Sequence, residues 1–127
     1  MRVWASGLVV LAGLAGAMGM IEAAGAAHEA ASPLLQVSAN FLLISGATTI
    51  ALTAVAFAIE TRAGWFLAAA SLLLAGCLLF CTDMTTRALL AHRLFPFAAP
   101  TGGSLMILGW LAAALAGAVS CFKKAKD

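Results

Sequence analysis

The sequence predicts an all-α membrane protein in which four transmembrane helices form an antiparallel bundle. Of its 127 residues, 64% are apolar and only 9% are charged, against roughly 25% charged in an average soluble domain. Four uncharged stretches are each long enough to span a bilayer, because a spanning helix needs about 20 mostly apolar residues. So few charged side chains cannot cover the surface of a small globule, and lipid is the solvent that fits this composition.

The whole chain, residues 1–127, is expected to form one domain. Its spans are predicted at about residues 3–24, 36–59, 63–82 and 102–122. The first span also resembles a cleavable signal peptide, because Arg2 precedes an apolar core that ends in small residues. An uncleaved span is favoured, since its loss would deprive the other three of a glycine-rich partner suited to helix packing.

Short polar segments separate the first three spans. His28, Glu29 and Pro33 interrupt the apolar pattern after the first span. Proline suits the start of a helix, where its missing N–H costs nothing. Residues 60–62, Glu-Thr-Arg, predict a tight turn, which makes the second and third spans antiparallel.

The third connection is longer, and its first part, residues 83–93, still has a helical pattern. Asp83 and Arg87 are four residues apart in the order that favours an ion pair on a helix. Pro96 and Pro100 are expected to end any helix here, because proline disrupts a helix interior. The last span is therefore expected to begin after Pro100.

The distribution of lysine and arginine predicts the orientation. With four spans, one side of the membrane collects Arg2, Arg62, Lys123, Lys124 and Lys126, and the other side has only Arg87 and Arg93. Both termini are therefore expected in the cytoplasm. The net charge of +2 is too small and scattered for a nucleic-acid interface, so no nucleic-acid partner is expected.

Small residues recur at helical spacing in two of the spans, where they can let helix backbones approach closely. The predicted packing positions are Gly16 and Gly19 in the first span and Gly109, Ala113 and Gly117 in the last. The alternative is that alanine and glycine are simply abundant in this chain.

Several short motifs resemble those of one membrane-protein family. Residues 97–103, Phe-Ala-Ala-Pro-Thr-Gly-Gly, and then Gly109-Trp110 are similar to its Thr-Pro-x-Gly-Gly and Gly-Trp signature. Residues 26–28 resemble its Gly-Ala-His end to the first span. The family is a small four-span bacterial group catalogued as a domain of unknown function, number 423, and is similar to eukaryotic transmembrane protein 256. The resemblance implies a four-span fold in the bacterial inner (cytoplasmic) membrane, and it implies no activity.

The chain also departs from that family's pattern. The family's Tyr and His in the second span fall at Phe41 and Ser45, and its Ser-Gly-Ser segment becomes Cys81-Thr82-Asp83. These differences put in doubt any role that the family's polar groups have at those positions.

Glu22 is the strongest candidate for a functional polar residue, because a carboxylate inside a membrane is costly and marks a functional site by default. The alternative places it near the outer headgroups, hydrated or paired with Arg87 or Arg93. Asn40, with the hydroxyl residues of the second span, is a further polar candidate, but such groups also serve ordinary helix packing.

The remaining candidates for ligands are weak. His28 and His92 are expected on the same side of the membrane and could hold a metal or haem iron, but interfacial placement is favoured. Cys77 and Cys81 share a helical face, yet two further metal ligands are missing nearby in sequence. No metal or cofactor is therefore expected.

The sequence contains no phosphate-binding loop, nucleophile elbow or His-Glu-x-x-His motif, so an enzyme is not expected. The favoured hypothesis is a structural or accessory subunit in contact with the lipid bilayer, docked to a larger membrane complex or to itself. The alternatives are a homo-oligomeric transporter or channel for a small solute, ion or lipid, and a haem module that uses the two histidines.

Overall fold

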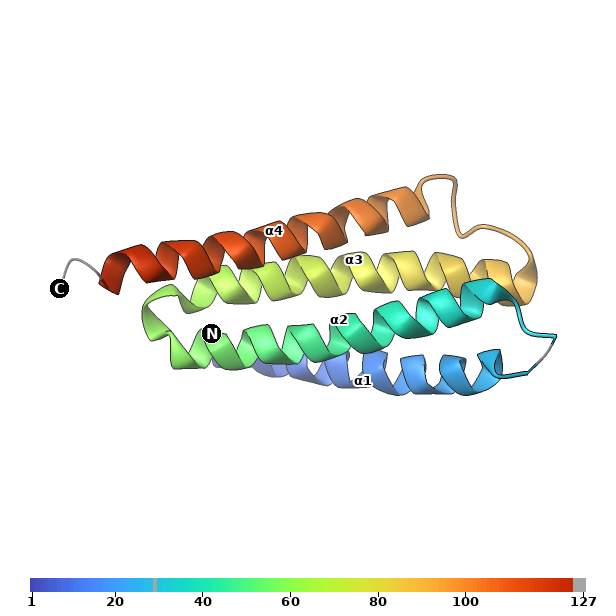
Figure 1. Ribbon diagram of the computed structural model, residues 1–127, viewed down its shortest axis with the longest axis horizontal. Coiled ribbons are helices and arrows are strands. Elements are labelled where there is room, and N and C mark those ends of the chain that lie inside the picture. Colours follow the sequence, from blue (N-terminus) through green and yellow to red (C-terminus); the bar gives the residue numbers. More distant parts are fainter. Residues whose placement is uncertain (29, 125–127) are drawn as a thin grey trace.

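The computed structural model describes residues 1–28 and 30–124, without the side chains of residues 61 and 122–124. Its helices are α1 (Arg2–Ala26), α2 (Pro33–Ala58), the short 3-10 helix η1 (Glu60–Arg62), α3 (Ala63–Leu90) and α4 (Ala98–Lys124). The four α-helices are long and apolar enough to cross a membrane and alternate in direction (Figure 1). The prediction of an all-α, four-span membrane protein is confirmed. Glu29 and Lys126 lie outside the described residues.

The boundaries differ from the predicted spans mainly around the third connection. α3 continues to Leu90 rather than ending near residue 82, and α4 begins at Ala98 rather than near residue 102. The expectation that Pro100 ends a helix is wrong, because Pro100 is the third residue of α4. A proline in the first turn of a helix loses no hydrogen bond, since the N–H groups there have no partner within the helix. α2 begins as expected, with Pro33 at its start and the Ser32 hydroxyl accepting from Leu34 N.

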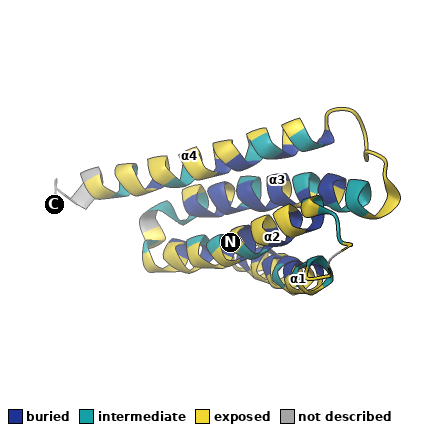
Figure 2. Ribbon diagram, turned by 45° about the vertical axis from the view of Figure 1, so that its right-hand side comes forward, coloured by how far each residue is buried: buried dark blue, intermediate teal, exposed yellow. Residues whose placement is uncertain are grey.

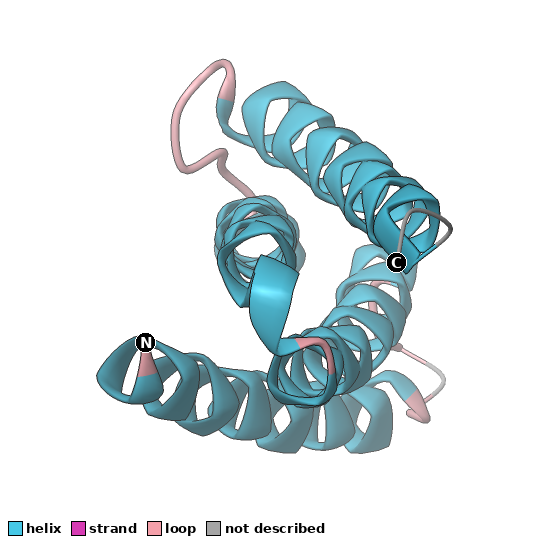
Figure 3. Ribbon diagram, turned by 90° about the vertical axis from the view of Figure 1, so that its left-hand side faces the viewer, coloured by secondary structure: helices cyan, strands magenta, loops and turns pink. Residues whose placement is uncertain are grey.

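The helices pack mainly in chain order: α1 on α2, α2 on α3 and α3 on α4, with much weaker contact between α1 and α3. Viewed along the helices, α1 and α4 lie at opposite edges of the molecule (Figure 3). Half of the most apolar stretch of α3 is buried, against 17% in α4. α4 is exposed along most of the side that faces away from α3 (Figure 2).

Glycines allow α3 and α4 to lie against each other. A Cβ atom at Gly102 would lie 2.6 Å from Phe80 N, and one at Gly76 would lie 2.7 Å from the Gly102 carbonyl oxygen. A Cβ atom at Gly109 would lie 2.7 Å from Leu73 N. All three positions therefore need glycine, because no side chain fits between the two backbones.

The first two helices approach each other at other small residues. A Cβ atom at Gly19 would lie 3.0 Å from Leu42 Cβ, and one at Gly46 would lie 2.9 Å from the Ala12 carbonyl oxygen and 3.5 Å from Gly16 N. Gly19 of α1 thus packs closely on α2. The backbone of Gly16 also lies near Gly46, but a Cβ atom at Gly16 would have no atom within 4 Å, so this contact does not require glycine there.

The last helix presents a different face from the one predicted. Ala113 is half-buried, but Gly117 is exposed, and no atom lies within 4 Å of a Cβ placed there. The expectation that Gly117 packs within the bundle is wrong for the described residues, because after Ala98 the buried positions of α4 are Gly102, Met106, Gly109 and Ala116. Residues three, four or seven positions apart lie on one face of a helix. Gly117 is not part of this series and therefore lies on a face that points away from α3.

A buried carboxylate, that of Asp83, holds the loop between α3 and α4 in place. Asp83 is fully buried, and its carboxylate pairs with Arg87 Nη2 at 2.5 Å and accepts a hydrogen bond from Leu94 N at 2.8 Å. The loop thus folds back onto a residue eleven positions earlier. Helix α3 ends at Leu90 and is capped by Ala91, whose φ of 57° is in the left-handed region. Glycine usually occupies this position because other residues are strained there.

Candidate ligand site between α1 and α3

Two adjoining cavities lie between α1 and α3, where these helices make little contact. One, of about 410 Å³, includes Trp4 and Ser71. The other, of about 480 Å³, includes Glu22 and Leu42 of α2. Leu11 and Leu78 line both. We call the two cavities together the α1–α3 groove. Most of its lining is apolar. Glu22 and three threonines lie at one end, and at the other end Ser71 accepts a hydrogen bond from Trp4 Nε1 and donates to the Leu67 carbonyl oxygen.

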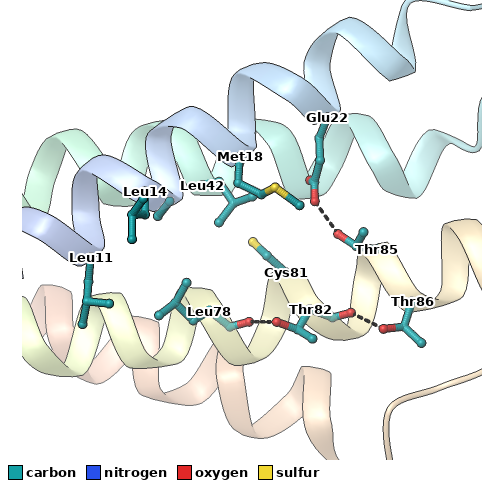
Figure 4. A pocket seen from close by; sticks show the side chains of 11 residues that line it. Leu11, Leu14, Met18, Glu22, Leu42, Leu78, Cys81, Thr82, Thr85 and Thr86 are labelled. Atoms are coloured by element: carbon teal, nitrogen blue, oxygen red, sulfur yellow. Dashed lines mark hydrogen bonds between the residues drawn. The ribbon is translucent and has the colours of Figure 1, made fainter.

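Glu22 is the only residue of the groove with a carboxyl group, and it is 5% exposed. Its Oε1 atom accepts a hydrogen bond from Thr85 Oγ1 at 2.6 Å (Figure 4). Its Oε2 atom is buried and has no hydrogen-bond partner among the described residues. A buried acceptor left without a donor typically costs about 1–3 kcal/mol, and more when it is charged. The groove therefore contains an unsatisfied acceptor in its wall.

Thr85 connects this carboxyl group to a third helix. Its Oγ1 lies 3.1 Å from Oγ of Ser38 on α2. Because Thr85 gives its own proton to Glu22, the proton between Ser38 and Thr85 is that of Ser38, whose Oγ also lies 3.4 Å from the Cys81 carbonyl oxygen. The chain Ser38–Thr85–Glu22 thus joins α2, α3 and α1 inside the protein.

Two further threonines of α3 line the same end of the groove. Thr82 Oγ1 donates to the Leu78 carbonyl oxygen at 2.6 Å, and Thr86 Oγ1 donates to the Thr82 carbonyl oxygen at 2.7 Å (Figure 4). Each hydroxyl has a single proton, which is already used in these bonds, so each offers only lone pairs to a ligand. The polar end of the groove is therefore composed of hydrogen-bond acceptors.

The structure separates Glu22 from its predicted ion-pair partners. Arg87 pairs with Asp83 instead, and within the described part of the chain Glu22 forms no ion pair. Asp83 and Arg87 hold the loop before α4 and do not line the groove. The ion pair between Asp83 and Arg87 that their spacing predicted is confirmed, and the alternative in which Arg87 pairs with Glu22 does not hold, because Asp83 takes the guanidinium.

The other polar candidates also lie away from Glu22. Asn40 is exposed and accepts a hydrogen bond from Gln36 Nε2 at 3.0 Å. Thr48 donates to the Ile44 carbonyl oxygen, and neither residue lines the groove. His28 is exposed and lines a separate cavity of about 390 Å³ beside the first loop. His92 is exposed, with Nδ1 3.1 Å from the Arg93 carbonyl oxygen.

The two cysteines of α3 contact the backbone of α2. The Cys77 thiol lies 3.4 Å from the Phe41 carbonyl oxygen, and the Cys81 thiol lies 3.5 Å from that of Ser38. The sulfur atoms are 3.7 Å apart, and both thiols are free. Among the described residues, no cluster of three or more His, Cys, Asp or Glu side chains is placed to hold a metal ion.

Sequence reasoning missed Ser38, Thr82, Thr85 and Thr86 as members of this site. One signal was present: α1 and α3 run in the same direction, so residues near the ends of both spans lie at similar depth. Three threonines in little more than one turn of α3 therefore lie level with the only carboxyl group in the body of α1.

Four apolar helices and an internal polar network near one end define a small multi-pass membrane protein. The sequence model described as "Protein of unknown function (DUF423)" matches residues 15–103, which is more than half of the chain. The chain therefore belongs to this family, and the resemblance seen in residues 97–103 is confirmed. The match includes Glu22, Ser38 and Thr85, whereas Gly109 and Trp110 lie beyond it. No solved structure matches the chain.

Proposed function

We propose that the protein is a non-enzymatic accessory subunit of the bacterial inner membrane that docks through α4 against a larger membrane protein. The observation that carries this proposal is the outward face of α4, where Ala114, Gly117 and Ala118 are all exposed. α4 packs mainly against α3, so this face has no covering helix within the described part of the chain.

Small residues on that face have no role in the packing of the protein itself. A glycine within a helix costs about 1 kcal/mol relative to alanine. At Gly102 and Gly109, close contact with α3 explains that cost, but nothing lies within 4 Å of a Cβ at Gly117. Lipid chains accept large apolar side chains equally well, whereas a neighbouring transmembrane helix packs best on small residues. A helix of another protein is the partner that fits this face.

The proposal includes an orientation with both termini in the cytoplasm. The start of α1, the η1 turn and the end of α4 lie at the same end of the molecule (Figure 1), which brings Arg2 and Arg62 to the side where α4 ends at Lys124. Short cytoplasmic loops and tails carry an excess of lysine and arginine.

The test is purification of the tagged protein in mild detergent from cells that express it naturally, followed by mass spectrometry of the proteins that accompany it. The proposal expects a membrane protein in stoichiometric amount, and its loss in a Gly117→Leu variant that still folds. Gly64→Leu is the matched control, because Gly64 also has no atom within 4 Å of a Cβ and lies on another helix.

Recovery of the protein without a second membrane protein would contradict the proposal. Recovery as a homo-oligomer would favour self-assembly, as in the transporter or channel alternative. If the partner remained bound to the Gly117→Leu variant, the docking surface would have to lie somewhere other than this face of α4.

A further inference from the structure

We propose that the α1–α3 groove binds a single-chain amphiphile with a primary ammonium head, which takes its place beside Glu22 while its chain extends along the groove. This site is distinct from the outward face of α4. It is defined by the unpartnered Oε2 atom of Glu22, by the acceptor character of the surrounding threonines and by the apolar remainder of the groove.

The polar end of the groove favours a ligand whose head group donates hydrogen bonds. Thr82 and Thr86 have given their protons to backbone carbonyl oxygens, and Glu22 Oε2 has no partner. These groups together present three acceptor atoms. A primary ammonium has three N–H donors and no acceptor, so it can satisfy them without leaving a group of its own unpaired.

The Glu22 carboxyl group can turn toward such a head group. Rotation about the last side-chain bond of glutamate has a broad energy profile, so Oε2 reaches the cavity without a change of helix position. Charges within a membrane are found paired with one another, and an ammonium ion supplies the countercharge that Arg87 does not provide, because Arg87 is paired with Asp83.

The rest of the groove selects an apolar chain. Between Glu22 and Trp4 the α1 side of the groove is lined by leucine, alanine, methionine and glycine. Leu11, Leu14 and Met18 are exposed on this side, so the groove opens sideways to the bilayer, from which an amphiphile can enter. Each cavity is within the range of about 300–1,000 Å³ that is typical of small-molecule sites.

The test compares four probes of equal chain length: dodecylamine, dodecanol, dodecanoate and dodecyltrimethylammonium. The full-length protein is incubated with each, and retained probe is measured by native mass spectrometry. The proposal expects one retained dodecylamine per protein and at least tenfold weaker retention of dodecanoate. Dodecyltrimethylammonium keeps the charge but has no N–H donor, so it is expected to bind more weakly than dodecylamine.

Variants separate the site from general partitioning into detergent. Glu22→Gln keeps the shape of the side chain and should weaken dodecylamine retention at least tenfold. Glu60→Gln is the matched control, because Glu60 is an exposed carboxylate in the turn at the other end of the molecule and its loss should change nothing. Leu78→Trp places a large side chain where the two cavities meet and should weaken the binding of dodecylamine and dodecanol alike.

Absence of dodecylamine binding to the wild-type protein would overturn the proposal. Equal retention of all four probes would overturn it as well, because the head group would then not be recognised. Unchanged binding to a Glu22→Gln protein whose helix content and melting temperature match the wild type would show that the head lies elsewhere, which also contradicts it. These outcomes are independent of whether α4 docks to another protein.

Discussion

Thr85 on α3 donates its hydroxyl proton to Glu22 on α1 over 2.6 Å, although the two residues are 63 positions apart in the chain. This bond joins two helices that make little contact, and the bond from Trp4 Nε1 to Ser71 Oγ at 2.9 Å joins the same pair near the other end of the groove. The bond from Thr85 orients the carboxyl group at the end of the groove and connects α1 to α3 at that level.

Replacing Thr85 by valine should destabilise the protein by about 1 kcal/mol, because hydrogen bonds between membrane helices average somewhat below this value and Glu22 would also lose its remaining donor. Unfolding in mixed micelles with increasing sodium dodecyl sulfate, followed by tryptophan fluorescence, measures the change. Thr86→Val is the control, since Thr86 bonds only to its own helix. Equal losses in the two variants would show that the bond to Glu22 contributes nothing specific.

Alanine at Gly102 or Gly109 should destabilise the protein by about 1–3 kcal/mol, the usual cost of forcing extra atoms into a packed contact. A Cβ at either position meets the backbone of α3 at 2.6–2.7 Å, so the helices must separate. Gly117→Ala should be neutral or stabilising by up to about 1 kcal/mol in the isolated protein, because alanine favours the helix and meets no neighbour. The same micelle unfolding assay tests all three. A large loss at Gly117 would mean that this face is already covered.

Ala91→Gly should stabilise the isolated protein by up to about 1 kcal/mol. Ala91 has a φ of 57°, and an L-residue in this region carries a strain of roughly 1–2 kcal/mol that glycine avoids. The greater freedom of glycine in the unfolded chain offsets part of the gain. A melting temperature that falls would indicate that Ala91 leaves the left-handed region in the membrane.

The orientation can be tested with a thiol placed beside the basic C-terminal segment. In a variant without native cysteines, a cysteine at position 124 should be protected from a membrane-impermeant maleimide in intact cells and should react after the membrane is opened. A cysteine at His92, which is exposed in the loop between α3 and α4, should react in intact cells. The reverse pattern would place both termini outside.

The four spans could be predicted from the sequence because each is an uncharged stretch of sufficient length, and the turn at Glu60–Arg62 was visible as a short polar break. The start of α4 was missed because Pro100 was interpreted as the end of a helix, although proline is also common in the first turn of a helix. The roles of Gly76 and Gly102 could not be recognised, since glycine spacing alone does not say which helix face meets a neighbour.

The candidate site was only partly predictable for a related reason. Glu22 stands out in the sequence because a carboxyl group in an apolar span is rare. Its partners are threonines, which are common in membrane helices and usually bond to their own backbone, as Thr82 and Thr86 do. Only the packing of α1 beside α3 shows that Thr85 is the exception.

The order of helix packing bears on how the protein is made. Each helix after the first packs extensively on the one synthesised just before it, and chains are synthesised N-terminus first. Every newly inserted span therefore finds a packing partner already in the bilayer. Such local assembly is the fast regime of folding. Helix α4 is the last to be inserted. It packs on α3 at the edge of the bundle, and its other face remains exposed for contact with a further protein.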